Sequence, residues 1–155
     1  MRAEFRMRMF DPPREQRITC ENPAAIACPG MTAARQILGK RGEVIAEEWL
    51  VARGWRILER RFRSGHRDID LVIEKGQGAA KVVAFVEVKT RLSPGFGGPL
   101  AAVHWRKQRE MARAARDWMA SSTGGSAAFR FDVIGVIYGT GPPEIIHVEN
   151  AFQVR

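Results

Sequence analysis

Apolar residues recur at helical spacing in two stretches of the chain. The first helix is predicted over about 33–53, with Thr32 placed to cap its start and Gly54 to end it. Its apolar stripe contains Leu38, Ile45, Ala46, Trp49 and Leu50. The second helix is predicted over about 103–121, before a glycine pair at 124–125. Its apolar side contains Met111, Ala115, Trp118 and Met119. Each helix therefore has one face to bury against another element.

Alternation of apolar and polar residues, or a short apolar run, predicts strands in the rest of the chain. These strands cover about 55–62, 67–74, 81–89, 129–138 and 144–149. The strand over 81–89 is apolar on both of its faces, which is typical of a strand inside a sheet. The resulting order, α-β-β-β-α-β-β, predicts an α/β sandwich in which a central mixed sheet is flanked by helices.

The first part of the chain shows neither the helical nor the strand spacing of apolar residues. Residues 1–31 are interrupted by arginines and by prolines, at Pro12, Pro13, Pro23 and Pro29. We expect a disordered or loosely attached extension there, and one ordered domain over 32–155. Met31 stands at the junction and is an alternative start, which the intact mass of the native protein would test.

The charge of the chain points to an anionic partner. The formal net charge is +8, the pI is near 10.5, and most of the 25 basic residues are arginine. Nucleic acid is the first candidate and an anionic membrane the second, while coding bias toward arginine is the alternative explanation. No apolar run could span a bilayer and no signal peptide is recognisable. No basic amphipathic helix with large apolar residues opposite is recognisable either, so no membrane partner is expected. Cys20 and Cys28 have no further ligands at zinc spacing and form no disulfide framework, which indicates the cytoplasm.

Acidic residues of two neighbouring strands are predicted to face one another. With a hairpin turn near Gly78, Asp70 falls opposite Glu87. In the same register Asp68 falls opposite Lys89, and side-chain alternation puts both pairs on one face. Two facing carboxylates repel one another, and a divalent cation such as Mg²⁺ would relieve the repulsion. Charges that line a solvent-exposed edge strand are the alternative, although a strand with two apolar faces is not an edge.

Several short motifs together resemble a known family. Asp70, followed by Glu87-Val88-Lys89 on the next strand, resembles the PD-(D/E)xK nuclease motif. The wider pattern resembles the YraN-like family of proposed endonucleases, relatives of the archaeal Holliday-junction resolvases, and covers about residues 36–150. The matching stretches are Gly42-Glu43 with Ala46 and Leu50, then 54–58, 68–72, 85–91 and 130–134.

The chain departs from the family pattern at two places. Asp68 stands where the family usually has glutamate, so a shorter carboxylate occupies that position. The segment 61–63 replaces an Asn-Tyr-Arg-type sequence. Asp132 matches the family but lies in mid-strand between apolar residues, so we expect it to be a buried structural partner of an arginine with no part in the chemistry.

The resemblance implies a restriction-endonuclease-like sandwich and a Mg²⁺-dependent endonuclease that acts on branched or structured DNA, with Mn²⁺ able to substitute. It implies that Asp70, Glu87 and the backbone carbonyl of Val88 bind the metal ion. Lys89 would orient the attacking water or stabilise the developing negative charge. Glu43 would support the metal site from the first helix, and a solvated helix charge is the alternative for it.

Clusters of basic residues predict where nucleic acid would bind. The candidate residues are Arg61, Arg63, Arg67, Arg91, Arg106 and Lys107. DNA is favoured over RNA as the partner, and a homodimer is left open because resolvases that cut two strands symmetrically are dimers. The competing interpretation is a non-catalytic nucleic-acid-binding module on a nuclease fold, because fold resemblance does not settle activity.

Overall fold

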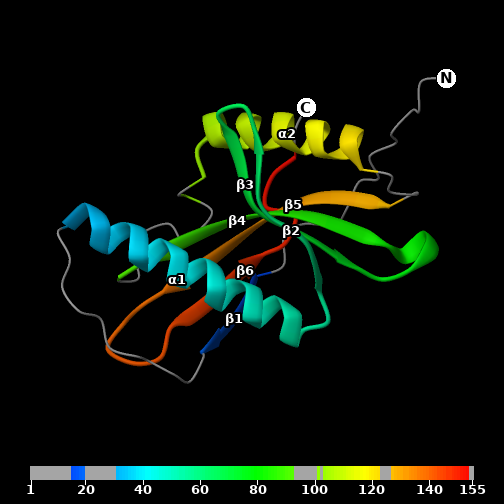
Figure 1. Ribbon diagram of the computed structural model, residues 1–155. Helices are drawn as coiled ribbons and strands as arrows, with labels where there is room; N and C mark the ends of the chain where they lie inside the picture. Colours follow the sequence, from blue (N-terminus) through cyan, green and yellow to red (C-terminus); the bar gives the residue numbers. More distant parts are fainter. Residues whose placement is uncertain (1–14, 20–30, 93–100, 102, 123–126, 154–155) are drawn as a thin grey trace.

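The computed structural model describes residues 15–19, 31–92, 101, 103–122 and 127–153 (Figure 1). Their strands form one six-stranded mixed sheet in the order β1-β6-β5-β4-β3-β2, in which only β4 and β5 run parallel. The elements are β1 (Glu15–Thr19), α1 (Met31–Ala52), β2 (Arg56–Ser64), β3 (Arg67–Lys75), the 3₁₀ turn η1 (Gly78–Ala80), β4 (Val82–Arg91), α2 (Trp105–Ser121), β5 (Ala128–Ile137) and β6 (Glu144–Val148).

Both predicted helices and all the predicted strands are present within two residues of the expected bounds. One detail of α1 differs. The helix begins at Met31, so Thr32 lies in its first turn and is not the capping residue. Gly54 follows the end of α1 with a φ of 81°, a left-handed conformation that glycine adopts at little cost, as the sequence predicted.

A strand precedes α1 that the sequence pattern did not predict. Residues Glu15–Thr19 form β1, which pairs antiparallel with β6 at the edge of the sheet. The expected disorder of residues 1–31 therefore does not hold for this segment. Five residues with little alternation carry a weak local signal, and the strand depends on the backbone ladder that β6 offers. The rest of the extension, including Cys20 and Cys28, lies outside the described residues.

The two helices cover opposite faces of the sheet (Figure 1). On the α1 face, Trp49 and Leu50 pack against Ala84 and Val86 of β4 in one buried cluster. On the α2 face, a second cluster contains Met111 and Trp118 of α2 together with Val83 and Phe85 of β4. The prediction that β4 is buried on both faces is thus confirmed.

Asp132 is completely buried on β5, as expected, and contacts an arginine. Its Oδ2 accepts hydrogen bonds from Arg130 at 3.0 Å and lies 2.9 Å from Nε2 of His147, while its Oδ1 accepts one from the backbone N–H of Asn150. These contacts satisfy the buried carboxylate and join β5 to β6 and to the turn that follows. The group is structural, because its partners come from the fold itself.

The hairpin formed by β2 and β3 leaves the plane of the sheet at its far end. β3 pairs with β4 only from Leu71 to Lys75, whereas its pairing with β2 continues to Arg67. A register shift in β2 between Ile57 and Glu59 and a positive φ of 51° at Arg61 accompany this bend. The free end of the hairpin lies beside α2 (Figure 1). A gap therefore opens between β3 and β4.

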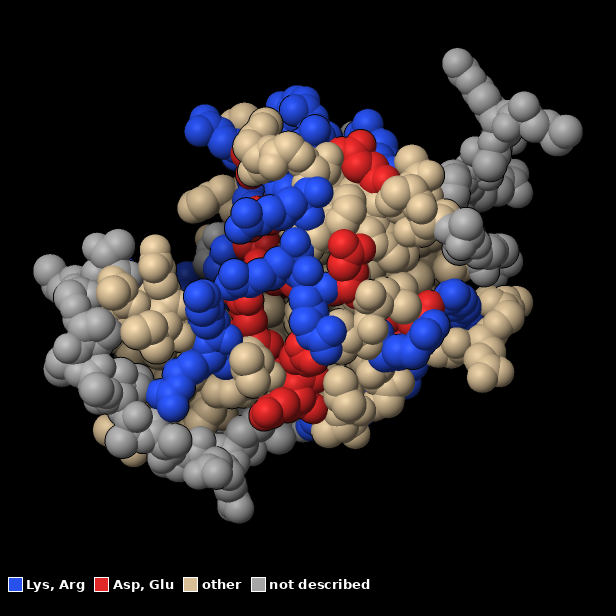
Figure 2. All heavy atoms as spheres, viewed as in Figure 1, with Lys and Arg blue, Asp and Glu red and all other residues tan. Residues whose placement is uncertain are grey.

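Charged side chains are unevenly spread over the surface. Figure 2 shows Lys and Arg over α2, and a line of Asp and Glu with basic neighbours down the middle of the same face. No helix among the described residues is both long and apolar enough to cross a membrane.

Candidate active site

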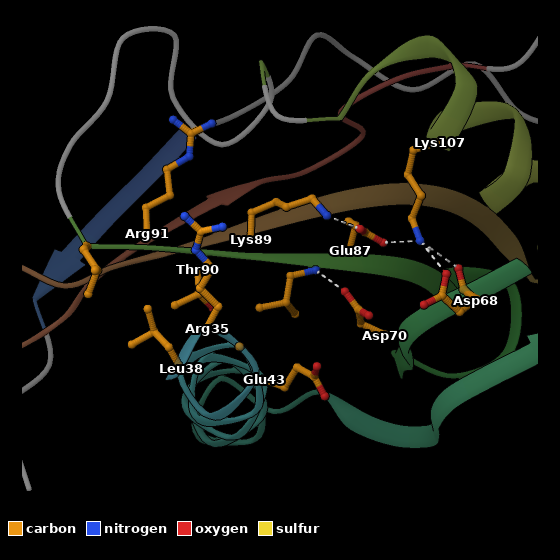
Figure 3. A pocket seen from close by; sticks show the side chains of 13 residues that line it. Arg35, Leu38, Glu43, Asp68, Asp70, Glu87, Lys89, Thr90, Arg91 and Lys107 are labelled. Atoms are coloured by element: carbon orange, nitrogen blue, oxygen red, sulfur yellow. Dashed lines mark hydrogen bonds and ion pairs between the residues drawn. The ribbon is translucent and has the colours of Figure 1, made fainter. Parts of the chain in front are cut away.

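A pocket of 810 Å³ occupies the gap between β3 and β4 (Figure 3). Four elements contribute its walls: α1, β3, β4 and α2. The residues that line it are Arg35, Leu38, Gly39, Glu43, Asp68, Asp70, Glu87, Val88, Lys89, Thr90, Arg91, Leu92 and Lys107. All four predicted catalytic residues, Glu43, Asp70, Glu87 and Lys89, are among them.

The register of β3 against β4 is the one that the sequence predicted. Leu71 pairs with Val86, and one step further along this register Asp70 faces Glu87. The ladder ends before that step. Instead of a backbone bond, Oδ2 of Asp70 accepts a hydrogen bond of 2.7 Å from the backbone N–H of Val88. The Asp70 carboxylate thus bridges the gap where the two strands part.

Glu87 is buried, with 2% of its surface exposed, yet it carries two lysine contacts. Nζ of Lys89 donates a hydrogen bond to its Oε1. Nζ of Lys107, which comes from α2, lies 3.2 Å from its Oε2 as an ion pair. Oε2 is buried and has no hydrogen-bond partner among the described residues, so Lys107 balances its charge without satisfying it as an acceptor.

The surroundings of Asp70 change the ionisation of its carboxyl group. Burial, and next to it the negative charge of Glu87, raises the pKa of Asp70 to about 7. The hydrogen bond from Val88 N–H and the charge of Lys107 act in the opposite direction, and the charge of Glu43 adds to the rise. The site thus holds a carboxyl group that a bound cation would help to ionise.

The donor set fits a hard divalent cation that keeps part of its water shell. Asp70 and Glu87 supply carboxylate oxygens from two strands. In an extended strand the N–H and C=O of one residue point to the same side, so the carbonyl of Val88 faces Asp70 as its N–H does. No group of three or more His, Cys, Asp or Glu side chains gathers at metal-binding distance among the described residues. Mg²⁺ requires no such cage, because one or two carboxylates and several waters satisfy it.

Glu43 lies in the pocket wall and is paired with an arginine. Its carboxylate accepts two hydrogen bonds from Arg61 of β2, at 2.8 and 3.0 Å. Helix α1 carries it into the pocket on the side of Asp70 (Figure 3). It is therefore neither an isolated solvated charge nor a free ligand, and it connects α1 to the hairpin beside the site.

Asp68 does not pair with Lys89 as the extrapolated register suggested. β3 has parted from β4 at this point, and Asp68 instead accepts a hydrogen bond of 2.7 Å from Nζ of Lys107. This contact holds the pKa of Asp68 below its usual value. Lys107 consequently binds two acidic residues at once, Asp68 and Glu87.

The predicted nucleic-acid-binding residues divide into two groups. Arg61, Arg67 and Lys107 form ion pairs with Glu43, Asp117 and the two pocket acids. Arg63, Arg91 and Arg106 form no ion pair with any described carboxylate, so their guanidinium groups are available to an anionic ligand. Sequence reasoning missed Arg35, which lines the pocket near Thr90 and Arg91 (Figure 3). Its helical spacing from Glu43, which is two turns away along the same face, was the signal.

Fold and site together define a mixed α/β protein with a pocket of paired carboxylates and lysines at the point where two antiparallel strands separate. The chain belongs to the family described as "Uncharacterised protein family UPF0102", whose model matches residues 42–136. The YraN-like resemblance is confirmed at the level of this family. A UPF0102 protein of Anaeromyxobacter dehalogenans is 42% identical over 119 residues, which cover 77% of this chain and 86% of that protein. A UPF0102 protein of Trichlorobacter lovleyi is 41% identical over 127 residues, which cover 81% of this chain and 98% of that protein.

Among solved structures, SfsA of Pyrococcus furiosus in complex with Ca²⁺ is similar at 15% sequence identity and a TM-score of 0.31. The match covers 77% of this chain, and the chain spans 65% of that protein, which is less than two thirds of its length. A similarity of this size indicates neither a shared site nor a shared function.

Proposed function

We propose that this protein hydrolyses phosphodiester bonds of nucleic acid with a Mg²⁺ ion bound by Asp70 and Glu87. One observation carries the proposal: two acidic side chains from different strands meet in a pocket, where burial, and next to it the charge of Glu87, raises the pKa of Asp70 to about 7. Such a pair is costly unless a cation or a reaction uses it. The same arrangement supports placing the fold in the restriction-endonuclease-like class.

Each pocket residue has a role that its position supports. Bound Mg²⁺ would polarise the phosphate and lower the pKa of a coordinated water, which Mn²⁺ could also do. The ammonium of Lys89, held against Glu87, offers positive charge where the oxyanion develops. Lys107 positions Glu87 from the opposite wall and tethers Asp68.

Arg35 and Arg91 form a basic end of the pocket that suits phosphate groups next to the one being cut. Both line the pocket, at the end away from Asp68 and Lys107 (Figure 3). Arginine matches phosphate oxygens with two parallel donors. A strand of nucleic acid would therefore contact these residues while its reacting phosphate lies at the carboxylates. We take DNA, in branched or structured form, as the substrate and a cytoplasmic homodimer as the working assembly.

The experiment is a panel of labelled linear, nicked, flapped and four-way DNA substrates, each incubated with Mg²⁺, Mn²⁺ or EDTA. Cleavage with metal ions, lost in EDTA and in Asp70→Ala and Glu87→Ala, is the expected result. Glu47→Ala is the matched control, because Glu47 is an α1 acid that pairs with Arg60 and does not line the pocket. Cleavage that persists in both pocket variants would overturn the site assignment.

A binding module without catalysis is the second candidate, and one observation favours it. Glu87 already has two lysine partners, so its charge is balanced without any metal ion. Retention of DNA binding with no cleavage of any substrate under any metal condition would establish this alternative.

A further inference from the structure

The outer face of α2 combines free positive charge with one exposed aromatic ring. Arg106, Arg109, Arg113 and Arg116 recur at spacings of three and four residues and are all exposed, while Met111, Ala115 and their neighbours face the core. The arginines span about 15 Å along the helix at a rise of 1.5 Å per residue. None of the four forms an ion pair with a carboxylate in the described part of the chain. The four arginines thus form a basic row along α2, and Figure 2 shows basic groups over this helix.

Trp105 lies at the first position of α2 and is 62% exposed. The other three tryptophans, Trp49, Trp55 and Trp118, are buried. The guanidinium carbons of Arg106 and Arg109 lie 5.8 and 5.7 Å from the centre of the Trp105 ring. The exposed indole and the two arginines at cation–π distance from it present a flat aromatic face together with positive charge, a combination that matches a ligand with both a flat surface and negative charge.

We propose that this surface, Trp105 with the α2 arginines, binds a single-stranded segment of nucleic acid by stacking an unpaired base on the indole ring. Bases in a continuous duplex are stacked on one another and offer no free face, whereas an unpaired base does. The arginines then contact the phosphates that follow along the helix. The proposal rests on the proposed nucleic-acid substrate and adds that the substrate has an unpaired region.

The arrangement of α2 places this surface beside the pocket. Lys107 points inward from the same helix turn, to Asp68 and Glu87, while Trp105 and Arg106 are exposed. The proposed binding surface and the pocket are thus only two residues apart along α2, from Trp105 to Lys107. Junctions of duplex with single strand would satisfy both surfaces at once.

Binding in EDTA separates this inference from catalysis. The full chain, with Asp70→Ala to exclude cleavage, is titrated into fluorescently labelled oligothymidylate, a duplex of equal length and an abasic strand of equal length. Trp105→Ala should weaken binding of oligothymidylate about fivefold or more, and leave the duplex and the abasic strand unchanged. Trp105→Phe should retain most of the affinity, because phenylalanine also stacks. Val51→Ala is the matched control, since Val51 is an apolar residue 52% exposed on α1 and does not line the pocket.

A second readout comes from tryptophan fluorescence. Oligothymidylate should quench the fluorescence of the exposed Trp105, and the quenching should disappear in Trp105→Phe although that variant still binds.

The arginines are tested by the salt dependence of binding. Arg109→Gln and Arg116→Gln should lower the dependence of affinity on salt for all three nucleic-acid ligands. Vesicles of anionic phospholipid are titrated as a fourth ligand. An equal loss for duplex and single strand in Trp105→Ala, no loss at all, or a loss only for the vesicles would each overturn the proposal. Failure of the cleavage assay would leave these binding results intact.

Discussion

The ionisation of one side chain, Asp70, connects the stability of the fold to its chemistry. Burial and the charge of Glu87 raise its pKa, so the folded protein binds a proton that the unfolded chain releases. In the absence of metal the folded state is therefore favoured at low pH, and this advantage is lost as the pH rises through about 7. A cation that binds the ionised pair would compensate for the loss.

Asp70→Asn should remove this pH dependence. Asparagine keeps an oxygen for the N–H of Val88 and cannot ionise. In EDTA the variant should match the wild type near pH 4 and exceed it increasingly up to about pH 7, by at most about 4 kcal/mol at 1.36 kcal/mol per pKa unit. The measurement is the free energy of unfolding of both proteins across this pH range. A difference between them that does not vary with pH would contradict the assigned pKa.

At the scale of elements, the close approach of α1 to β4 depends on a glycine. A Cβ placed on Gly42 would lie 1.9 Å from Oγ1 of Thr90 and 3.1 Å from its Cβ. Any side chain there would push α1 away from the strand and would move its neighbour Glu43 as well. Helix α1 therefore contacts β4 at Gly42, and this close contact places the neighbouring Glu43 in the wall of the pocket.

Gly42→Ala should destabilise the protein by about 1–3 kcal/mol, the usual cost of overpacking. Adding Thr90→Ala should recover much of the loss, because only the 3.1 Å contact with Cβ would remain. Gly39→Ala is the control on the same helix, since nothing lies within 4 Å of its added carbon, and it should be neutral or stabilising. Chemical denaturation of these three variants and of Thr90→Ala alone gives the double-mutant cycle that tests this. Additive effects of the two substitutions would disprove the contact.

Sequence reasoning predicted the elements and the β3–β4 register because both rest on local patterns. A hairpin around Gly78 fixes which residues of the two strands face one another, and this register places Asp70 opposite Glu87. The divergence of β3 from β4 could not be predicted in the same way. It accompanies a bulge in β2 and the positive φ of Arg61, a residue type that carries no signal for that conformation. The pairing of Glu43 with Arg61 was missed for this reason.

At the scale of the whole molecule, the sheet ends in two edge strands, β1 and β2. β1 pairs with β6 and satisfies the backbone groups on that side. An exposed strand edge invites association with other chains. β1, which contains Glu15 and Arg17, thus puts a charged edge strand in place of β6, which is mostly apolar and buried; its sequence alone did not reveal this role.

A chain that starts at Met31 should have a lower melting temperature, by several degrees, and should self-associate as its concentration rises, because it lacks β1. A chain that starts at residue 15 keeps β1 and is the control. Thermal unfolding and light scattering at several concentrations provide the measurement. Equal behaviour of the two shortened chains would show that the edge of β6 needs no cover.

The bent hairpin has a consequence for the geometry of the two acids. Glu87 belongs to the main sheet, whereas the end of β3 just beyond Asp70 is anchored to α2, where Arg67 and Ser64 both contact Asp117 and Lys107 holds Asp68. The separation of the two carboxylates is therefore governed by where α2 rests on the sheet. A disturbance near Asp117, at the far end of that helix, would therefore change the spacing of two carboxylates that Asp117 does not touch.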